Sequence, residues 1–233
     1  MKISGIIKTS LIDFSGYLTT TVFTQGCNFK CPYCHNPELI PLESQDRDYM
    51  DLEYFWDFLD KRDKLIDAVT ITGGEPTLQS DIVEFIEKIK SKGFKVKLDT
   101  NGSDPTTVQK LIQNNLIDYL AMDLKGSLEN YNLYTAKDQN TLLNNIKETI
   151  AIIRESKIDY EFRTTVVPGL HDKKELRKVA ELIDEDDKYV LQNFKPNKTY
   201  NSQYENKTRF SDQKIEEFEE LMKETCRLVE VKN

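Results

Sequence analysis

The stretch TTVFTQGCNFKCPYCHNPEL, residues 20–39, places three of the chain's four cysteines within a short loop. The β-rich run in residues 18–26 predicts a strand that stops at a glycine. Cys27, Cys31 and Cys34 then follow in the spacing C-x3-C-x2-C, so their sulfur atoms can point at one centre. Clustered thiols of this kind indicate a metal site, because a disulfide framework spreads its cysteine pairs through a small secreted domain.

The composition is typical of a globular protein. The 233 residues are 38% hydrophobic and 31% charged, with a formal net charge of -8. Phosphate binding requires concentrated Lys and Arg, so this acidic balance argues against nucleic acid as a main partner. No apolar run approaches the length of about 18 residues that a membrane span needs, and the N-terminus lacks a signal-peptide core. We therefore expect a cytoplasmic protein without membrane association.

Six β-rich segments alternate with helical patterns along the chain. The predicted strands lie in residues 18–26, 67–74, 94–102, 118–126, 159–169 and 188–196. The predicted helices lie in residues 52–66, 80–93, 104–115, 142–156, 173–184 and 211–229. Six strand-helix units predict an α/β fold with a parallel sheet. A closed TIM barrel needs eight, so we expect an open, partial (β/α)6 barrel of TIM type, although periodicity alone leaves a doubly wound sheet possible.

We expect residues 1–233 to form a single domain, because no repeat, low-complexity tract or linker divides them. Residues 1–17 would be an N-terminal extension, residues 18–200 the barrel core, and residues 201–233 a C-terminal helix and tail. The fourth cysteine, Cys226, is predicted to be buried, since it lies at helical spacing from Phe218 and Met222.

Polar residues gather where the predicted strands end. These ends read GGEP at 73–76, DTNG at 99–102, MDLK at 122–125, RTT at 163–165 and QNF at 192–194. Side chains alternate along a strand, so Asp123 and Lys125 share one side, as do Arg163 and Thr165. Because the chemistry of such barrels occurs at the C-terminal ends of the strands, these groups predict a binding site there.

The thiols alone leave the kind of metal open. A structural zinc site normally takes four ligands, and His35 is adjacent to Cys34, so the two side chains would rarely reach the same ion. A 4Fe-4S cluster usually takes four cysteine thiolates. Three would leave one iron without a protein ligand, and a catalytic metal needs such an open position.

With Tyr33 before the last cysteine and Gly-Gly-Glu after the next strand, the sequence resembles the radical S-adenosylmethionine superfamily. GCNFKCPYCHNPEL, TITGGEP, LDTNG, MDLKG, RTTVVPG and LQNF together resemble its glycyl-radical-enzyme activating branch. Within that branch the chain is most similar to activating proteins of anaerobic ribonucleoside-triphosphate reductase. The resemblance implies one 4Fe-4S cluster on Cys27, Cys31 and Cys34, with S-adenosylmethionine on the open iron.

The resemblance also implies a reaction. An electron from a reductant such as flavodoxin or ferredoxin would enter the cluster, and reductive cleavage of S-adenosylmethionine would give methionine and a 5'-deoxyadenosyl radical. That radical would take a hydrogen atom from a glycine of the partner enzyme, which we expect to be the anaerobic reductase. No catalytic side chain is expected apart from the cluster ligands.

Ten further residues match positions that contact the cofactor in the activating branch. Gly73 and Gly74 would let the backbone approach it, beside Glu75 in the motif that meets the methionine amino end. Contacts to the cofactor or to a nearby monovalent cation are expected from Asn36, Asp99, Thr100, Asp123 and Lys125. Arg163 and Thr165 match contacts further along the barrel.

Two departures concern the partner. DFSG at 13–16 stands where activating enzymes of pyruvate formate-lyase have DGPG, and LQNFKPN lacks their histidine on the sixth strand. Two alternatives to an activase are a radical enzyme for a small molecule, similar to 7-carboxy-7-deazaguanine synthase, and a non-enzymatic zinc or electron-transfer module. CHNP and MDLK favour the activase. A zinc module would have no use for so many charged residues at the strand ends.

Overall fold

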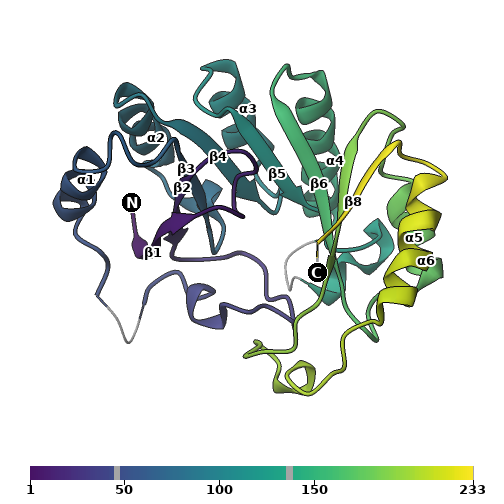
Figure 1. The fold of residues 1–233 in the computed structure, drawn as a ribbon. Coiled ribbons are helices and arrows are strands. Elements are labelled where there is room, and N and C mark those ends of the chain that lie inside the picture. The colour runs from purple at the N-terminus through teal and green to yellow at the C-terminus, as the bar shows by residue number, and fades with distance from the viewer. Residues whose placement is uncertain (45–47, 135–138, 233) are drawn as a thin grey trace. The chain divides into compact units, whose positions relative to one another are not determined.

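The computed structural model describes residues 1–44, 48–134 and 139–232 (Figure 1). The chain forms two compact units. The first comprises Met1–Asn28, Glu38–Leu120 and Glu148–Asp159, and the second Phe29–Pro37, Ala121–Lys147 and Tyr160–Asn233. Strand β5 (Tyr119–Asp123) and helix α4 (Gln139–Glu155) contribute residues to both. In the described ranges, we find no helix with the length and apolar character needed to cross a membrane.

The first unit is built on four strands, which follow one another in sequence order. Its elements are β1 (Ile3–Ser10), β2 (Thr19–Thr24), α1 (Leu52–Asp60), β3 (Ala68–Gly73), α2 (Ile82–Ser91), β4 (Lys95–Thr100) and α3 (Pro105–Gln113). Strand β1 runs antiparallel to β2, whereas the β2–β3 and β3–β4 pairs are parallel. The register pairs Thr24 with Gly73, so the cysteine loop and the GGEP turn leave the sheet side by side.

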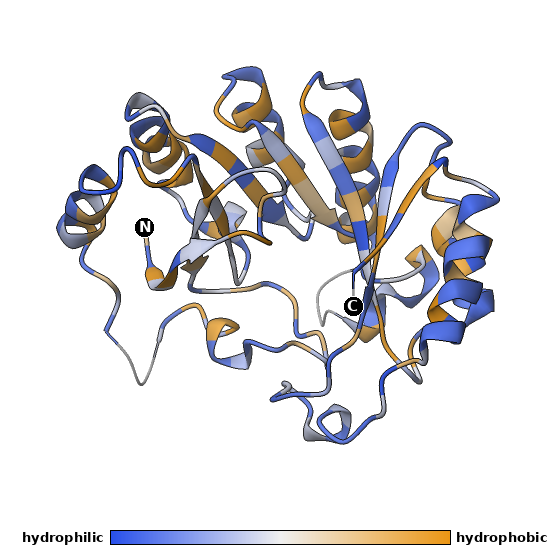
Figure 2. Cartoon of the chain, in the orientation of Figure 1, coloured by the Kyte–Doolittle hydropathy of each residue, from blue (hydrophilic) through white to orange (hydrophobic). Residues whose placement is uncertain are grey.

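Burial explains why these segments form strands and covering helices. The β-branched residues of β2 and β3 are mostly buried, as is usual when helices cover a parallel sheet. Helix α2 buries Ile82, Phe85, Ile86 and Ile89, and Figure 2 shows hydrophobic residues in orange along one side of it. Helix α3 begins as predicted, because the Asp104 side chain accepts a hydrogen bond from the Thr107 amide.

The second unit repeats the pattern of strand and helix. It contains β6 (Asp159–Val166, whose first residue belongs to the first unit), α5 (Lys173–Ala180), β7 (Lys188–Asn193), α6 (Asp212–Lys223) and β8 (Leu228–Lys232). The β6–β7 and β7–β8 pairs are parallel, and α5 packs beside α6 (Figure 1). Short 3-10 helices occupy Pro37–Leu39, Pro76–Leu78, Leu128–Leu133 and Ser202–Tyr204.

The six predicted strands and six predicted helices are confirmed within the described residues, most of them shorter than expected. Strands β1 and β8 were not predicted. The expectation that one helix covers residues 211–229 is wrong, because α6 ends at Lys223 and β8 follows. The burial predicted for Cys226 is confirmed nevertheless: it is 1% exposed, and its Sγ donates to the Asp187 carbonyl over 2.8 Å.

Candidate active site

In the first unit, the chain bends at Gln25 between the end of β2 and Cys27. Gly26 has a φ of 95°, a conformation that favours glycine. Its amide donates to the Leu39 carbonyl over 2.8 Å, and the Cys27 amide donates to the Ile40 carbonyl over 3.0 Å. The backbone at the first cysteine is therefore held in place by the segment that returns after the motif.

Cys31 and Cys34 lie in the second unit, where backbone hydrogen bonds fix their loop. The Cys34 amide donates to the Cys31 carbonyl over 3.0 Å, which closes a turn around the PY pair. Two amides from the segment after β7 donate to this turn: Asn201 to Pro32 over 2.9 Å and Tyr200 to Cys34 over 3.0 Å. Backbone hydrogen bonds within the turn and from the segment after β7 thus hold the turn that carries the last two cysteines.

His35 holds the cysteine loop against the segment after β7. Its ring stacks on Phe194 with centroids 5.4 Å apart, and Nε2 lies 2.7 Å from the Lys195 carbonyl. Phe194 also contacts the ring of Tyr33 edge-on. The aromatic residue at the end of β7 therefore anchors the loop, and no signal within the CHNP motif points to a partner so distant in sequence.

The chemistry of this loop suits an iron-sulfur cluster. Cys27, Cys31 and Cys34 are present as thiols, and Cys31 is buried. The Tyr33 hydroxyl is also buried and finds no hydrogen-bond partner among the described residues, as expected beside a site that receives a further group. Burial raises the pKa of Tyr33, so its hydroxyl stays protonated. Among the described residues, no three His, Cys, Asp or Glu side chains form a group that could hold a metal ion as they stand. The cluster assignment rests on the donor set and the motif.

Gly73 and Gly74 fit closely against the strand that precedes Cys27. Gly73 has a φ of 115°, and a side chain there would overlap the Thr24 backbone. A side chain on Gly74 would overlap the Gly26 carbonyl, to which the Glu75 amide donates over 2.7 Å. Only glycine permits this approach of two backbones, so the first role of the pair is to join the GGEP turn to the cysteine loop.

We expect Gly74→Ala to destabilise the cluster-free protein by about 3 kcal/mol, because the new methyl group has no room. Gly5→Ala is the matched control, since its added carbon would meet no atom within 4 Å. Urea unfolding followed by circular dichroism measures both. Equal stability of the two variants would show that the GGEP turn can move away from the strand.

Glu75 is 1% exposed, and four hydrogen bonds surround its carboxylate. Oε1 accepts from the Thr77 amide and hydroxyl and from the Thr100 hydroxyl, and Oε2 accepts from the Asn101 amide over 2.7 Å. Burial raises the pKa of Glu75, although these donors oppose the shift. The geometry shows a carboxylate that joins the ends of β3 and β4. Its predicted contact with the cofactor stays a prediction.

Three polar residues extend this network toward the cysteine loop. The side-chain Nδ2 of Asn101 donates to Asn28 Oδ1 over 2.8 Å, and the side-chain Nδ2 of Asn28 donates to the Ser103 hydroxyl over 2.7 Å. Sequence reasoning missed Asn28, although its place directly after Cys27 was a usable signal. The loop that holds the first cysteine is therefore connected to the DTNG turn.

Asp123, Lys125 and Arg163 come together in the second unit, as the alternation of side chains predicts. Asp123 Oδ2 lies 2.9 Å from Lys125 Nζ, and Oδ1 lies 2.8 Å from Arg163 Nε. Burial alone would raise the pKa of Asp123, but the two cations outweigh it and hold that pKa well below its usual range. The aspartate stays ionised, and the pair of cations retains a net positive charge that suits a carboxylate ligand.

His171 fixes the strand end that carries this ion pair. Its Nδ1 accepts from the Val167 amide over 3.1 Å, so Nε2 carries the proton and donates to the Lys125 carbonyl over 2.9 Å. Burial lowers the pKa of His171, which keeps the ring neutral.

Two further predicted contact residues also lie in the second unit. The Thr165 hydroxyl donates to Gln192 Oε1 over 3.2 Å. Asn36 is half-buried in the cysteine loop.

Comparisons with known proteins identify the family. The family model described as Radical SAM superfamily matches residues 21–183. The chain belongs to the Radical SAM superfamily. Members use a 4Fe-4S cluster and S-adenosylmethionine, which sets aside the zinc module as an alternative.

Its relatives place this radical SAM protein with the enzymes that activate glycyl-radical partners. It is 35% identical over 205 residues to a protein of Methanocaldococcus jannaschii named as a glycyl-radical enzyme activating enzyme, covering 87% of this chain and 83% of that one. It is 26% identical over 187 residues to the pyruvate formate-lyase-activating enzyme of Clostridium pasteurianum, covering 78% and 76%. The protein is thus an enzyme of the activase type.

Solved structures confirm the fold. The crystal structure of Streptococcus suis SuiB bound to S-adenosylmethionine superposes with a TM-score of 0.64 at 16% identity, covering 90% of this chain. The chain spans about half the length of SuiB, 48%. Because the identity is low, this likeness shows the open α/β fold of radical SAM enzymes and nothing about substrate.

Proposed function

We propose that this enzyme generates the glycyl radical of an anaerobic ribonucleoside-triphosphate reductase in the cytoplasm. The similarity to a glycyl-radical enzyme activating enzyme over most of both chains supports the assignment as an activase. The choice of reductase rests on the sequence. DFSG at 13–16 and the β7 end at Gln192–Phe194 differ from the pattern of pyruvate formate-lyase activating enzymes.

The residues of the site have separate tasks. Cys27, Cys31 and Cys34 would hold a 4Fe-4S cluster through their thiolates. When bound, the cluster supplies the electron that cleaves the sulfonium bond of S-adenosylmethionine. Gly73 and Gly74 keep the strand ends closely packed, and Glu75 ties the GGEP turn to the DTNG turn.

Charge then orients the cofactor. S-adenosylmethionine carries an amino group and a carboxylate, and the second unit offers both signs of charge at the end of β5. The ionised Asp123 suits the amino group, whereas Lys125 and Arg163 suit the carboxylate. Asn36, Asp99, Thr100 and Thr165 are the further contacts that we propose. The electron would come from a reductant such as flavodoxin or ferredoxin.

The test of the partner is electron paramagnetic resonance on a panel of glycyl-radical enzymes. The reduced, cluster-loaded protein and S-adenosylmethionine are mixed with an anaerobic ribonucleotide reductase or with pyruvate formate-lyase from the same organism. A glycyl signal in the mixture with the reductase, and none in the mixture with pyruvate formate-lyase, supports the proposal. A signal with pyruvate formate-lyase and none with the reductase would show that the choice of partner is wrong, while the activase assignment would stand.

A further inference from the structure

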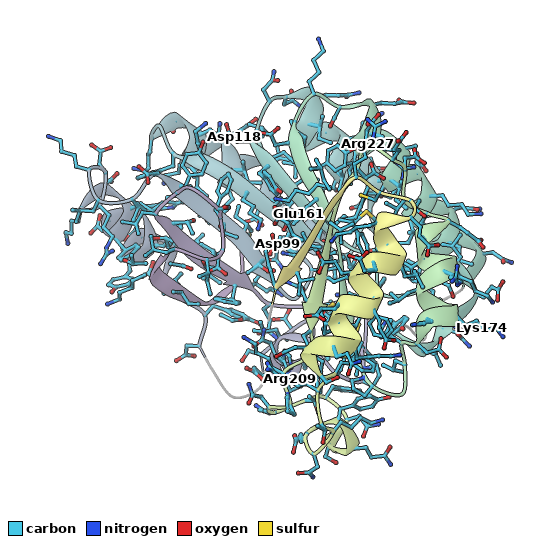
Figure 3. The ribbon with its side chains drawn as sticks, turned by 45° about the vertical axis from the view of Figure 1, so that its right-hand side comes forward. Asp99, Asp118, Glu161, Lys174, Arg209 and Arg227 are labelled. Atoms are coloured by element: carbon cyan, nitrogen blue, oxygen red, sulfur yellow. The ribbon has the colours of Figure 1, made fainter. Side chains whose placement is uncertain are left out.

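A lysine with no assigned role lies beside one of the proposed cofactor contacts in the first unit. Lys97 precedes Asp99 by two residues on β4, so both side chains leave the same side of the strand. The Lys97 side chain is only 5% exposed, and its Nζ lies 3.5 Å from Asp99 Oδ1. Figure 3 labels Asp99 near the end of this strand. A buried ammonium group is costly unless charged or polar groups surround it, so its place here requires an explanation.

This ammonium group also contacts a carbonyl oxygen and an aromatic ring. Lys97 Nζ donates to the Asp13 carbonyl over 2.6 Å and lies 5.5 Å from the centroid of the Tyr119 ring. A carboxylate and a carbonyl oxygen are the hard ligands that an alkali-metal ion also takes. Lys97 Nζ therefore contacts the two kinds of oxygen that such an ion takes.

Two further contacts help Lys97 to hold the segment before β2 against the sheet. The Thr21 hydroxyl donates to Asp13 Oδ2 over 2.6 Å, and the ring of Phe14 lies 5.5 Å from that of Tyr119. Beyond this anchor, Leu11 and Ile12 are 75% and 84% exposed. Lys97 thus connects the N-terminal segment to Asp99 through a single side chain.

We propose that Lys97 is a positioning residue that serves as a built-in cation for Asp99, in place of the monovalent ion expected near that carboxylate. The inference rests on the proposed cofactor site. Like charges repel strongly in a poorly solvated environment, so the ammonium group disfavours a second cation beside Asp99. Cofactor binding should then depend on Lys97 and not on the alkali-metal ion in the buffer.

The first experiment measures the dissociation constant of S-adenosylmethionine for the cluster-loaded protein by equilibrium dialysis, at constant ionic strength in potassium, sodium or choline chloride. For the natural protein, this dissociation constant should differ by less than about twofold among the three salts, because the Lys97 ammonium group supplies the cation. Lys97→Met should bind about tenfold more weakly in choline, and potassium should restore much of the affinity. Lys110→Met, an exposed lysine on α3, is the control and should behave like the natural protein.

The second experiment needs no cofactor. Hydrogen exchange of the cluster-free protein should show faster exchange of residues 11–17 in Lys97→Met than in Lys110→Met, because the anchor on Asp13 is lost. Circular dichroism checks that both variants fold, and Lys97→Gln, which also lacks the charge, replaces Lys97→Met if the latter does not. Potassium-dependent binding in the natural protein, or unchanged affinity and exchange in Lys97→Met, would overturn the inference. If the cluster-loaded natural protein bound no S-adenosylmethionine in any salt, the proposed function would fail instead.

Discussion

Cys31→Ala should abolish reductive cleavage of S-adenosylmethionine, whereas Cys226→Ala should leave it unchanged. Cys31 is the buried middle member of the motif, and its loss would leave two thiolates for the cluster that we propose on three. Liquid chromatography of 5'-deoxyadenosine after anaerobic reconstitution and reduction measures the activity. Iron and sulfide content measures the cluster.

Cys226 provides the matched control because it is also a buried thiol. It contacts the Asp187 carbonyl and lies past the end of α6, outside the motif. Cys226→Ala therefore tests whether removal of a buried thiol outside the motif lowers activity through a general effect on folding. Turnover in Cys31→Ala at the level of Cys226→Ala would contradict the assignment of the cluster to this loop.

Asp123→Asn should destabilise the cluster-free protein by about 3 kcal/mol and greatly weaken its binding of S-adenosylmethionine after reconstitution. Removing this charge leaves Lys125 and Arg163 mostly buried without the carboxylate that joins them, although Glu161 Oε1 still lies 4.0 Å from Arg163 Nη1. Glu185→Gln is the control, since Glu185 pairs with Arg227 at the surface, where an ion pair contributes little. Urea unfolding and equilibrium dialysis give the two quantities. Equal stability of the two variants would show that Asp123 is not the anion that these cations require.

The same aspartate predicts a dependence on pH. Its pKa is lower in the folded than in the unfolded protein, where an aspartate titrates near about 4. Its contribution to stability is therefore complete above that pH and is lost as the pH falls toward the folded pKa. The difference in unfolding free energy between the natural protein and Asp123→Asn should shrink below about pH 4. A constant difference down to pH 3 would contradict this account.

The sequence predicts the repeating part of the fold well, because each unit has a local signal. Periodicity identifies a helix such as α2, and the Asp104–Pro105 pair marks the start of α3. Strand β8 was missed because it has five residues and follows α6 after only residues 224–227, and the apolar pattern of the helix continues into it. Strand β1 was missed because Gly5 interrupts a run that already has few core residues.

For the site, motifs predict which residues gather but not what they bind within the protein. Alternation along the strands correctly predicts that Asp123 and Lys125 share a side, and their ion pair follows. It cannot predict that Glu75 accepts four hydrogen bonds, because Thr100 and Asn101 come from another strand end. The stacking of His35 on Phe194 and the contact of Lys97 with Asp13 depend on tertiary packing in the same way.

The most direct test of the central claim follows one hydrogen atom. The reduced, cluster-loaded protein is incubated with S-adenosylmethionine and an anaerobic ribonucleotide reductase whose glycine residues carry deuterium at Cα. Mass spectrometry then measures deuterium in the 5'-deoxyadenosine product. We predict that this product carries one deuterium atom and that the reductase gains a glycyl radical. Product without deuterium, formed while the reductase acquires its radical, would contradict direct transfer from the glycine.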